Sequence, residues 1–226
     1  MKPGMTEHEA TLAISEYERP ILRRYLDPVD VVWLATARRL GLWIRRNPAI
    51  FSSTDGSGRL ELGPRDTLDP DDCTAQMILH ELCHWITNGL ETFKQRDWGF
   101  ALDAELDWRE HAALRVQAAL ADTQGLRTQL APTSQFRKYY DDLPSDAFAP
   151  VSGWPCEDRV VPLARAAYAR AGEAPWGAPL RAALAAHAEI RRVVLPFLPD
   201  YASDVEDDPL PSLWAQDRLA EPPVDV

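Results

Sequence analysis

The sequence is poor in cysteine, in glycine and in long apolar runs, and each shortage excludes a class of protein. Three cysteines among 226 residues cannot all pair, so a disulfide-stabilised secreted scaffold is not expected. Eleven glycines without an internal repeat exclude collagen-like and low-complexity chains. The nearest approach to a membrane span, Val31 to Ile44, carries Arg38 and Arg39 in its middle. We therefore expect a globular protein that has no membrane partner.

Basic residues are also scarce. The chain has 24 Lys and Arg against 35 Asp and Glu, a formal net charge of −11. Because proteins that bind polyanions need clustered cations to displace counterions, nucleic acid is not an expected partner. The first residues, Met1 to Glu7, lack the apolar segment of an export signal, which predicts a cytoplasmic protein with reduced cysteines. The expected partner is a small molecule or a side chain of a peptide or protein.

Apolar periodicity predicts a mainly helical α+β fold. A composition of 46% hydrophobic and 26% charged residues is typical of a folded domain, which we assign to residues 1–199 as one catalytic, metal-binding unit. Helical recurrence of apolar residues predicts helices over Thr6–Leu26, Val29–Arg46, Asp107–Ala121, Asp158–Ala171 and Ala178–Leu195. We expect the last two to pack against the helices that carry the metal site described below.

Turn-forming residues place a small sheet and the loops between these helices. The segments Ala49–Ser53 and Arg59–Gly63 flank a turn and predict a β-hairpin. Pro132–Pro155 is expected to be rich in loops, with Ser134–Tyr140 either a surface helix or a group of cations and phenols for an anionic substrate. Residues 200–226 are acidic and are predicted to form a partly disordered tail.

The motif with the clearest chemistry lies in a further predicted helix, which Asp69 would cap, Pro70 would open and Asn88–Gly89 would end. Residues 80–84 of that helix read HELCH, an HExxH motif. Because helical residues four apart share a face, His80 and His84 can direct both imidazoles at one ion. In metallopeptidases the glutamate of this motif, here Glu81, is the general base that deprotonates metal-bound water.

A third ligand must come from outside this helix. The candidates after the chain reversal at Gly89 are Glu105, Glu110 and His111. Glu110 is preferred because it opens an Ala-rich helix that can pack closely against the HExxH helix. Neighbouring helical positions point about 100° apart, so Glu110 and His111 are alternatives rather than a pair. The prediction is a zincin-like pair of helices that holds one ion through His80, His84 and Glu110.

Two histidines and one carboxylate leave the metal open. With one water in a tetrahedral arrangement they form a hydrolytic zinc site, and as a facial triad they form a non-haem iron site. HExxH strings without metal also occur, so a metal-free binding module is a third reading. No motif for an organic cofactor is present, which leaves one divalent transition metal, Fe(II) or Zn(II), as the expected cofactor.

The residues around this motif resemble the elongation factor P hydroxylases, metal-dependent enzymes that hydroxylate a modified lysine. The likeness consists of HELCH followed by Trp85, of Gly89, of the Asp-Trp-Gly-Phe segment at residues 97–100, and of Glu110 at the start of the next helix. It extends over about residues 60–130. By this resemblance His80, His84 and Glu110 are the metal ligands, iron is the metal, and the reaction is a hydroxylation. After Phe100 this chain lacks the family's aromatic, proline and glycine stretch, so the resemblance does not extend to the substrate.

Four further residues are candidates for contact with a ligand or substrate. Cys83 could be a soft neighbour of the ion or a small buried hydrophobe. Trp85 could line the substrate site or belong to the core. Asp97 could hold a ligand imidazole through its second nitrogen or cap its own turn. His111 could lie beside the ion without binding it.

Overall fold

The computed structural model of the protein describes residues 25–68, 72–100 and 107–197. The predicted helix over residues 6–26 lies outside this part of the chain except for its last two residues. The acidic tail and the alternative ligand Glu105 lie outside it as well.

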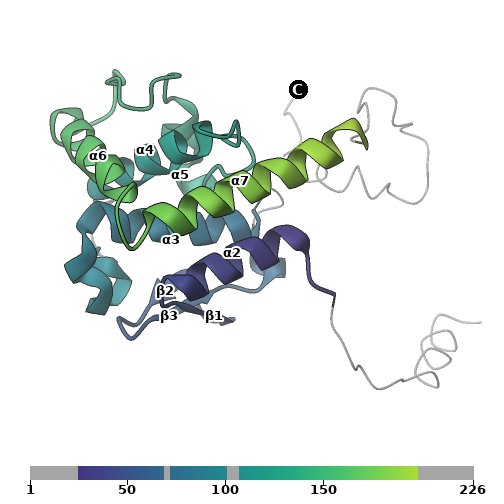
Figure 1. Ribbon diagram of the computed structural model, residues 1–226. Coiled ribbons are helices and arrows are strands. Elements are labelled where there is room, and N and C mark those ends of the chain that lie inside the picture. Colours follow the sequence, from purple (N-terminus) through teal and green to yellow (C-terminus); the bar gives the residue numbers. More distant parts are fainter. Residues whose placement is uncertain (1–24, 69–71, 101–106, 198–226) are drawn as a thin grey trace, which may run out of the picture.

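The described residues form a mainly helical α+β fold, as predicted. Six α-helices lie on one side of a small sheet (Figure 1), namely α2 (Pro28–Arg39), α3 (Thr74–Asn88), α4 (Arg109–Asp122), α5 (Ser134–Asp141), α6 (Glu157–Ala171) and α7 (Gly177–Val194). The described residues also include four short 3-10 helices, η1 (Arg65–Thr67), η2 (Leu90–Lys94), η3 (Arg96–Gly99) and η4 (Leu195–Phe197). The predicted helices over 107–121, 158–171 and 178–195 correspond to α4, α6 and α7, and the predicted surface helix corresponds to α5.

The sheet contains the predicted hairpin and one strand that was predicted to be helical. Strands β2 (Ser52–Thr54) and β3 (Arg59–Leu62) pair antiparallel, and β1 (Trp43–Arg46) pairs parallel with β3 on its other side. The prediction of one helix from Val29 to Arg46 was therefore wrong at its end. Gly41, at φ 85°, takes a left-handed conformation that ends the helix, and the chain continues as β1.

The start of α3 was also predicted wrongly. The helix begins at Thr74, with Cys73 as its N-cap, and not directly after Asp69. Cys73 Sγ accepts from the Gln76 amide at 3.3 Å. Thr74 Oγ1 donates to Asp30 of α2 and accepts from an arginine of β1, so tertiary contacts fix the first turn there. The predicted C-terminus is confirmed, because α3 ends at Asn88 with Gly89 at φ 100°.

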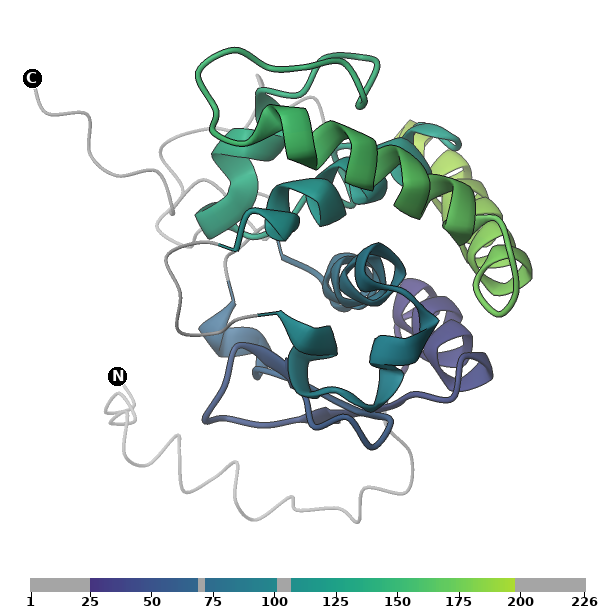
Figure 2. The ribbon, with the colours of Figure 1, turned by 90° about the vertical axis from the view of Figure 1, so that its left-hand side faces the viewer.

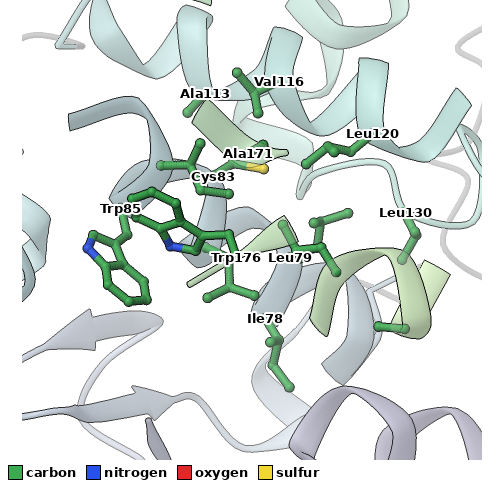
Figure 3. Close-up of a cluster of buried hydrophobic side chains, with 14 of the residues drawn as sticks. Ile78, Leu79, Cys83, Trp85, Ala113, Val116, Leu120, Leu130, Ala171 and Trp176 are labelled. Carbon is green, nitrogen blue, oxygen red and sulfur yellow. The ribbon is translucent and has the colours of Figure 1, made fainter. Parts of the chain in front are cut away.

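Helix α3 runs through the centre of the molecule and supplies most of the core. Figure 2 looks along it, with the sheet on one side and α4 and α6 on the other. It packs against α2, α4 and α6. Figure 3 shows side chains of α3 meeting those of α4, α6 and the loop before α7; the labelled ones are Ile78, Leu79, Cys83, Trp85, Ala113, Val116, Leu120, Leu130, Ala171 and Trp176. The residues of α3 are buried except for a half-buried stripe made of His80, His84 and Asn88.

Candidate metal centre

Helices α3 and α4 bring the three predicted ligands together. His80 Nε2 lies 3.1 Å from Glu110 Oε1, and His84 Nε2 lies 2.9 Å from Glu110 Oε2. The three ligand atoms all lie within 4.8 Å of one another, and among the described residues this is the group of His, Cys, Asp and Glu side chains that could hold a metal ion. Two nitrogen donors and a carboxylate suit Zn(II) or Fe(II), so the donor set fits the expected metal. The structure thus places Glu110, and not His111, beside the two imidazoles.

Gln117 of α4 sets the orientation of His80. Its Nε2 donates to the Leu130 carbonyl at 2.7 Å, so its Oε1 must face the other way. That oxygen lies 2.8 Å from His80 Nδ1 and accepts a hydrogen bond from the Nδ1–H group. With the Nδ1 proton held by Gln117, it is Nε2 of His80 that faces the site, and its lone pair becomes available when the Nε2 proton leaves. Outer hydrogen bonds of this kind fix the tautomer and direction of metal-binding histidines.

The charges of the cluster favour a protonated His80 when no ion is bound. Burial alone would lower the pKa of His80, but Glu110, together with Glu81 and Gln117, raises that pKa to about 9. Burial likewise acts to raise the pKa of Glu110, yet His84 and His80 hold it well below its usual value. A cation bound here replaces a proton on an imidazole, so metal binding and proton release are coupled.

Two aromatic rings cover the imidazoles. Phe100, just after η3, stacks on His84 with ring centroids 4.3 Å apart and planes 25° apart. Phe136 of α5 stacks on His80 at 5.8 Å with the same interplanar angle. Both phenyl rings are half-buried, and the ligand side chains keep exposures of 12% for His80, 13% for His84 and 8% for Glu110. The centre is thus nearly enclosed, with apolar walls on two sides.

Glu81 and Asp97 are buried acceptors beside the ligands. Glu81 Oε1 accepts from Ser52 at 2.6 Å and Oε2 accepts from the Trp98 indole at 2.9 Å. Asp97 Oδ1 accepts from the Ser53 hydroxyl at 2.7 Å and from the Thr54 amide at 2.9 Å. Asp97 therefore ties its own turn to β2, a contact that differs from both roles that the sequence left open.

The remaining candidates point away from the ligand atoms. Cys83 is fully buried in the core (Figure 3), and burial raises the pKa of its thiol well above the usual value. Trp85 is 2% exposed and packs against Trp98 and Trp176, so it belongs to the core. His111 stacks on Tyr139 of α5 at 3.8 Å, on another side of α4 from Glu110.

Three residues at the site escaped the sequence prediction. Gln117, Ser52 and Phe136 belong to three different elements and reach the centre only through tertiary packing. Gln117 had a local signal, because it follows Glu110 by two helical turns and so lies on the same face of α4. Ser52 and Phe136 had none.

Comparison of the chain with protein-family models, curated proteins and solved structures found no match. Among the described residues, no helix combines the length and the apolar character needed to cross a bilayer.

Proposed function

We propose that this protein is a metal-dependent enzyme whose ion is bound by His80, His84 and Glu110. The observation that carries the proposal is the convergence of two Nε2 atoms and one carboxylate from two packed helices. Two features support a functional ion rather than a structural one. The chain buries a large core without it, and three protein ligands leave coordination positions for a substrate or water.

We further propose that the reaction is an oxidative one, a hydroxylation or oxygenation at an Fe(II) centre. Two histidines and one carboxylate are the donor set of non-haem iron oxygenases, and the sequence from the HELCH motif to Glu110 resembles the elongation factor P hydroxylases. Bound Fe(II) would supply the capacity to react with molecular oxygen. The substrate is proposed to be a small molecule or a side chain of a peptide or protein.

The residues around the ligands have roles that follow from their contacts. Gln117 keeps the His80 lone pair directed at the site. Phe100 and Phe136 restrict the motion of the imidazoles and keep water away from their faces. A nearly enclosed, apolar surround favours a reacting group that is slender and uncharged, because a charged group would lose its hydration there without a partner.

Metal analysis combined with oxygen uptake tests this proposal. Protein purified anaerobically and loaded with Fe(II) is expected to hold one ion per chain and to consume oxygen. The H80A variant is expected to do neither. A chain that binds no transition metal when purified from metal-replete cells would overturn both enzymatic readings and leave the metal-free binding module.

The HExxH motif itself favours a second candidate, a zinc peptidase or amide hydrolase. This function predicts one Zn(II) per chain, no oxygen uptake, and a hydrolytic activity that requires Glu81 as general base. Turnover of a peptide or amide library by the zinc-loaded protein, with no activity in E81Q, would support it over the oxidative reaction.

A further inference from the structure

The position of Glu81 differs from what a general base requires. Both of its carboxylate oxygens already accept hydrogen bonds from buried or half-buried protein donors, Ser52 of β2 and Trp98 of η3. A general base must instead lie within hydrogen-bond reach of the proton that it removes. The Glu81 carboxylate thus joins three separate elements, α3, β2 and η3.

Glu81 also lies on the far edge of the His84 ring. Its Oε2 is 3.8 Å from His84 Nδ1, whereas the opposite ring nitrogen, Nε2, is 2.9 Å from Glu110 Oε2. The two nitrogens of an imidazole direct their lone pairs or protons away from each other. The carboxylate of Glu81 therefore faces the nitrogen that a metal bound between His84 and Glu110 would not use.

The segment that Glu81 holds is strained. Asp97 and Trp98 have φ angles of 47° and 56°, and Gly99 follows at 78°. Two successive non-glycine residues in the left-handed region persist only where the surroundings over-determine them. Residues of β2, α3 and α4 form hydrogen bonds with this segment. Its contacts are Ser53 and Thr54 of β2 to Asp97, Glu81 to the Trp98 indole, Asn88 to the Trp98 carbonyl, and Arg109 to the Gly99 carbonyl.

The strained turn places Phe100 against His84. The phenyl ring stacks on His84, with ring centroids 4.3 Å apart. The Arg109 guanidinium carbon lies 4.9 Å from the centroid of the same phenyl ring. A stacked ring leaves the imidazole little freedom to rotate. The contacts therefore form a continuous path from Glu81 through Trp98 and Phe100 to the plane of His84.

We propose that Glu81 is a positioning residue that fixes His84 through the turn at residues 97–99, and that it does not act as the base of a hydrolytic reaction. This inference rests on the proposed metal centre. The roles within the HExxH motif then differ in this chain. The two histidines bind the ion, while the glutamate stabilises the turn that positions His84. This role of Glu81 also favours the oxidative reaction over the hydrolytic one, since hydrolysis would need another base.

Titration with Co(II), which reports its coordination through its visible spectrum, tests the inference without a known substrate. The variants are E81Q, which keeps the side-chain shape but cannot accept both hydrogen bonds, and the double variant S52A/W98F, which keeps the carboxylate but removes both donors. E61Q is the matched control, because Glu61 is a half-buried carboxylate that accepts from Asn47 on the sheet. S52A alone serves if a larger change prevents folding.

A positioning role predicts that E81Q and S52A/W98F both weaken Co(II) binding by about tenfold to a hundredfold, the effect usual for residues that orient metal ligands. Both should alter the Co(II) spectrum in the same way, while E61Q leaves affinity and spectrum unchanged. A residue that served stability alone would lower the melting temperature and leave the spectrum of the bound ion as it was, which would overturn the inference.

If Glu81 is instead a general base, the variants should give a third pattern of Co(II) binding. E81Q would then bind Co(II) with wild-type affinity and spectrum, S52A/W98F would behave as wild type, and this outcome would also overturn the inference. Failure of the proposed function is distinguishable, because in that case the wild-type protein takes up no Co(II) at all.

Discussion

Helix α4 carries two buried polar clusters on different sides. They differ in how their hydrogen-bonding atoms are paired. Towards α3, Glu110 and the two histidines direct ligand atoms at one another. Towards α5 and α6, Arg115 is fully buried, and its three side-chain nitrogens donate to four acceptors, two of them shared by Nη1. Its partners are the Tyr139 hydroxyl at 2.6 Å, the carbonyls of Ala147 and Ala149, and the Glu157 carboxylate.

The comparison separates a structural cluster from a binding centre. Around Arg115 the donors are matched to acceptors, and the Tyr139 hydroxyl donates to Glu157 at 2.7 Å, so the cluster holds the Ala147–Ala149 loop in place. Around Glu110 one carboxylate serves two imidazoles whose Nε2 atoms face the same point. Both clusters are buried and charged, and only the convergence of ligand atoms distinguishes the candidate metal centre.

The largest effect is expected on the Arg115 side. Arg115→Met leaves the half-buried Glu157 carboxylate without its fully buried cation, which should lower the free energy of unfolding by about 3–5 kcal/mol. Urea denaturation measures this loss. The double variant R115M/E157L should recover much of the stability, because it removes the unpaired charge as well. A single variant as stable as wild type would show that the cluster is not the structural element we describe.

On the other side of α4, the ligands should control metal affinity and not the fold. Glu110→Ala removes one of three protein ligands and is expected to weaken Zn(II) or Fe(II) binding by about a hundredfold or more. Isothermal titration calorimetry measures the change. E157A, on the Arg115 side, should bind metal as wild type does in the fraction that is folded. Equal losses in the two variants would remove the distinction between the clusters.

Gln117 gives a finer test within the metal centre. Gln117→Leu removes the acceptor for His80 Nδ1 and should weaken metal binding by about tenfold to a hundredfold. Gln76→Leu is the matched control, since Gln76 is a buried glutamine of α3 that donates to Asp72 instead. If both variants bind metal alike, His80 does not depend on its amide partner.

The smallest effect is expected for His187, a histidine that lies outside both clusters. It accepts from the Trp33 indole at 3.2 Å, and burial lowers its pKa. A histidine whose pKa is lowered by folding contributes its full stability above its pKa in the unfolded chain, which is about 6.5. That contribution is lost as the pH falls through its pKa in the folded protein. The melting temperature of metal-free protein should therefore drop towards pH 5. H187Q, which can still accept through its amide oxygen, should flatten that part of the profile; an unchanged profile would contradict the assignment.

The sequence predicted what depends on local spacing and missed what depends on packing. His80 and His84 share a face because they are four residues apart on one helix, and Glu110 was identified because it opens the next apolar helix. The strand β1 was missed because Leu42, Trp43 and Ile44 continue an apolar pattern that suits either a helix or a strand, and only the left-handed Gly41 decides between them. The Glu81 contacts could not be predicted, since they join residues 29 and 17 positions apart.

The proposed ligands come from two helices, and His84 and Glu110 are 26 positions apart along the chain. A cation held by both helices is a cross-link that exists only in the folded protein, so its binding free energy adds to the free energy of unfolding. At a hundred times the dissociation constant this contribution is about 2.7 kcal/mol. Each candidate metal can therefore be ranked by how far it raises the melting temperature, before any substrate is known.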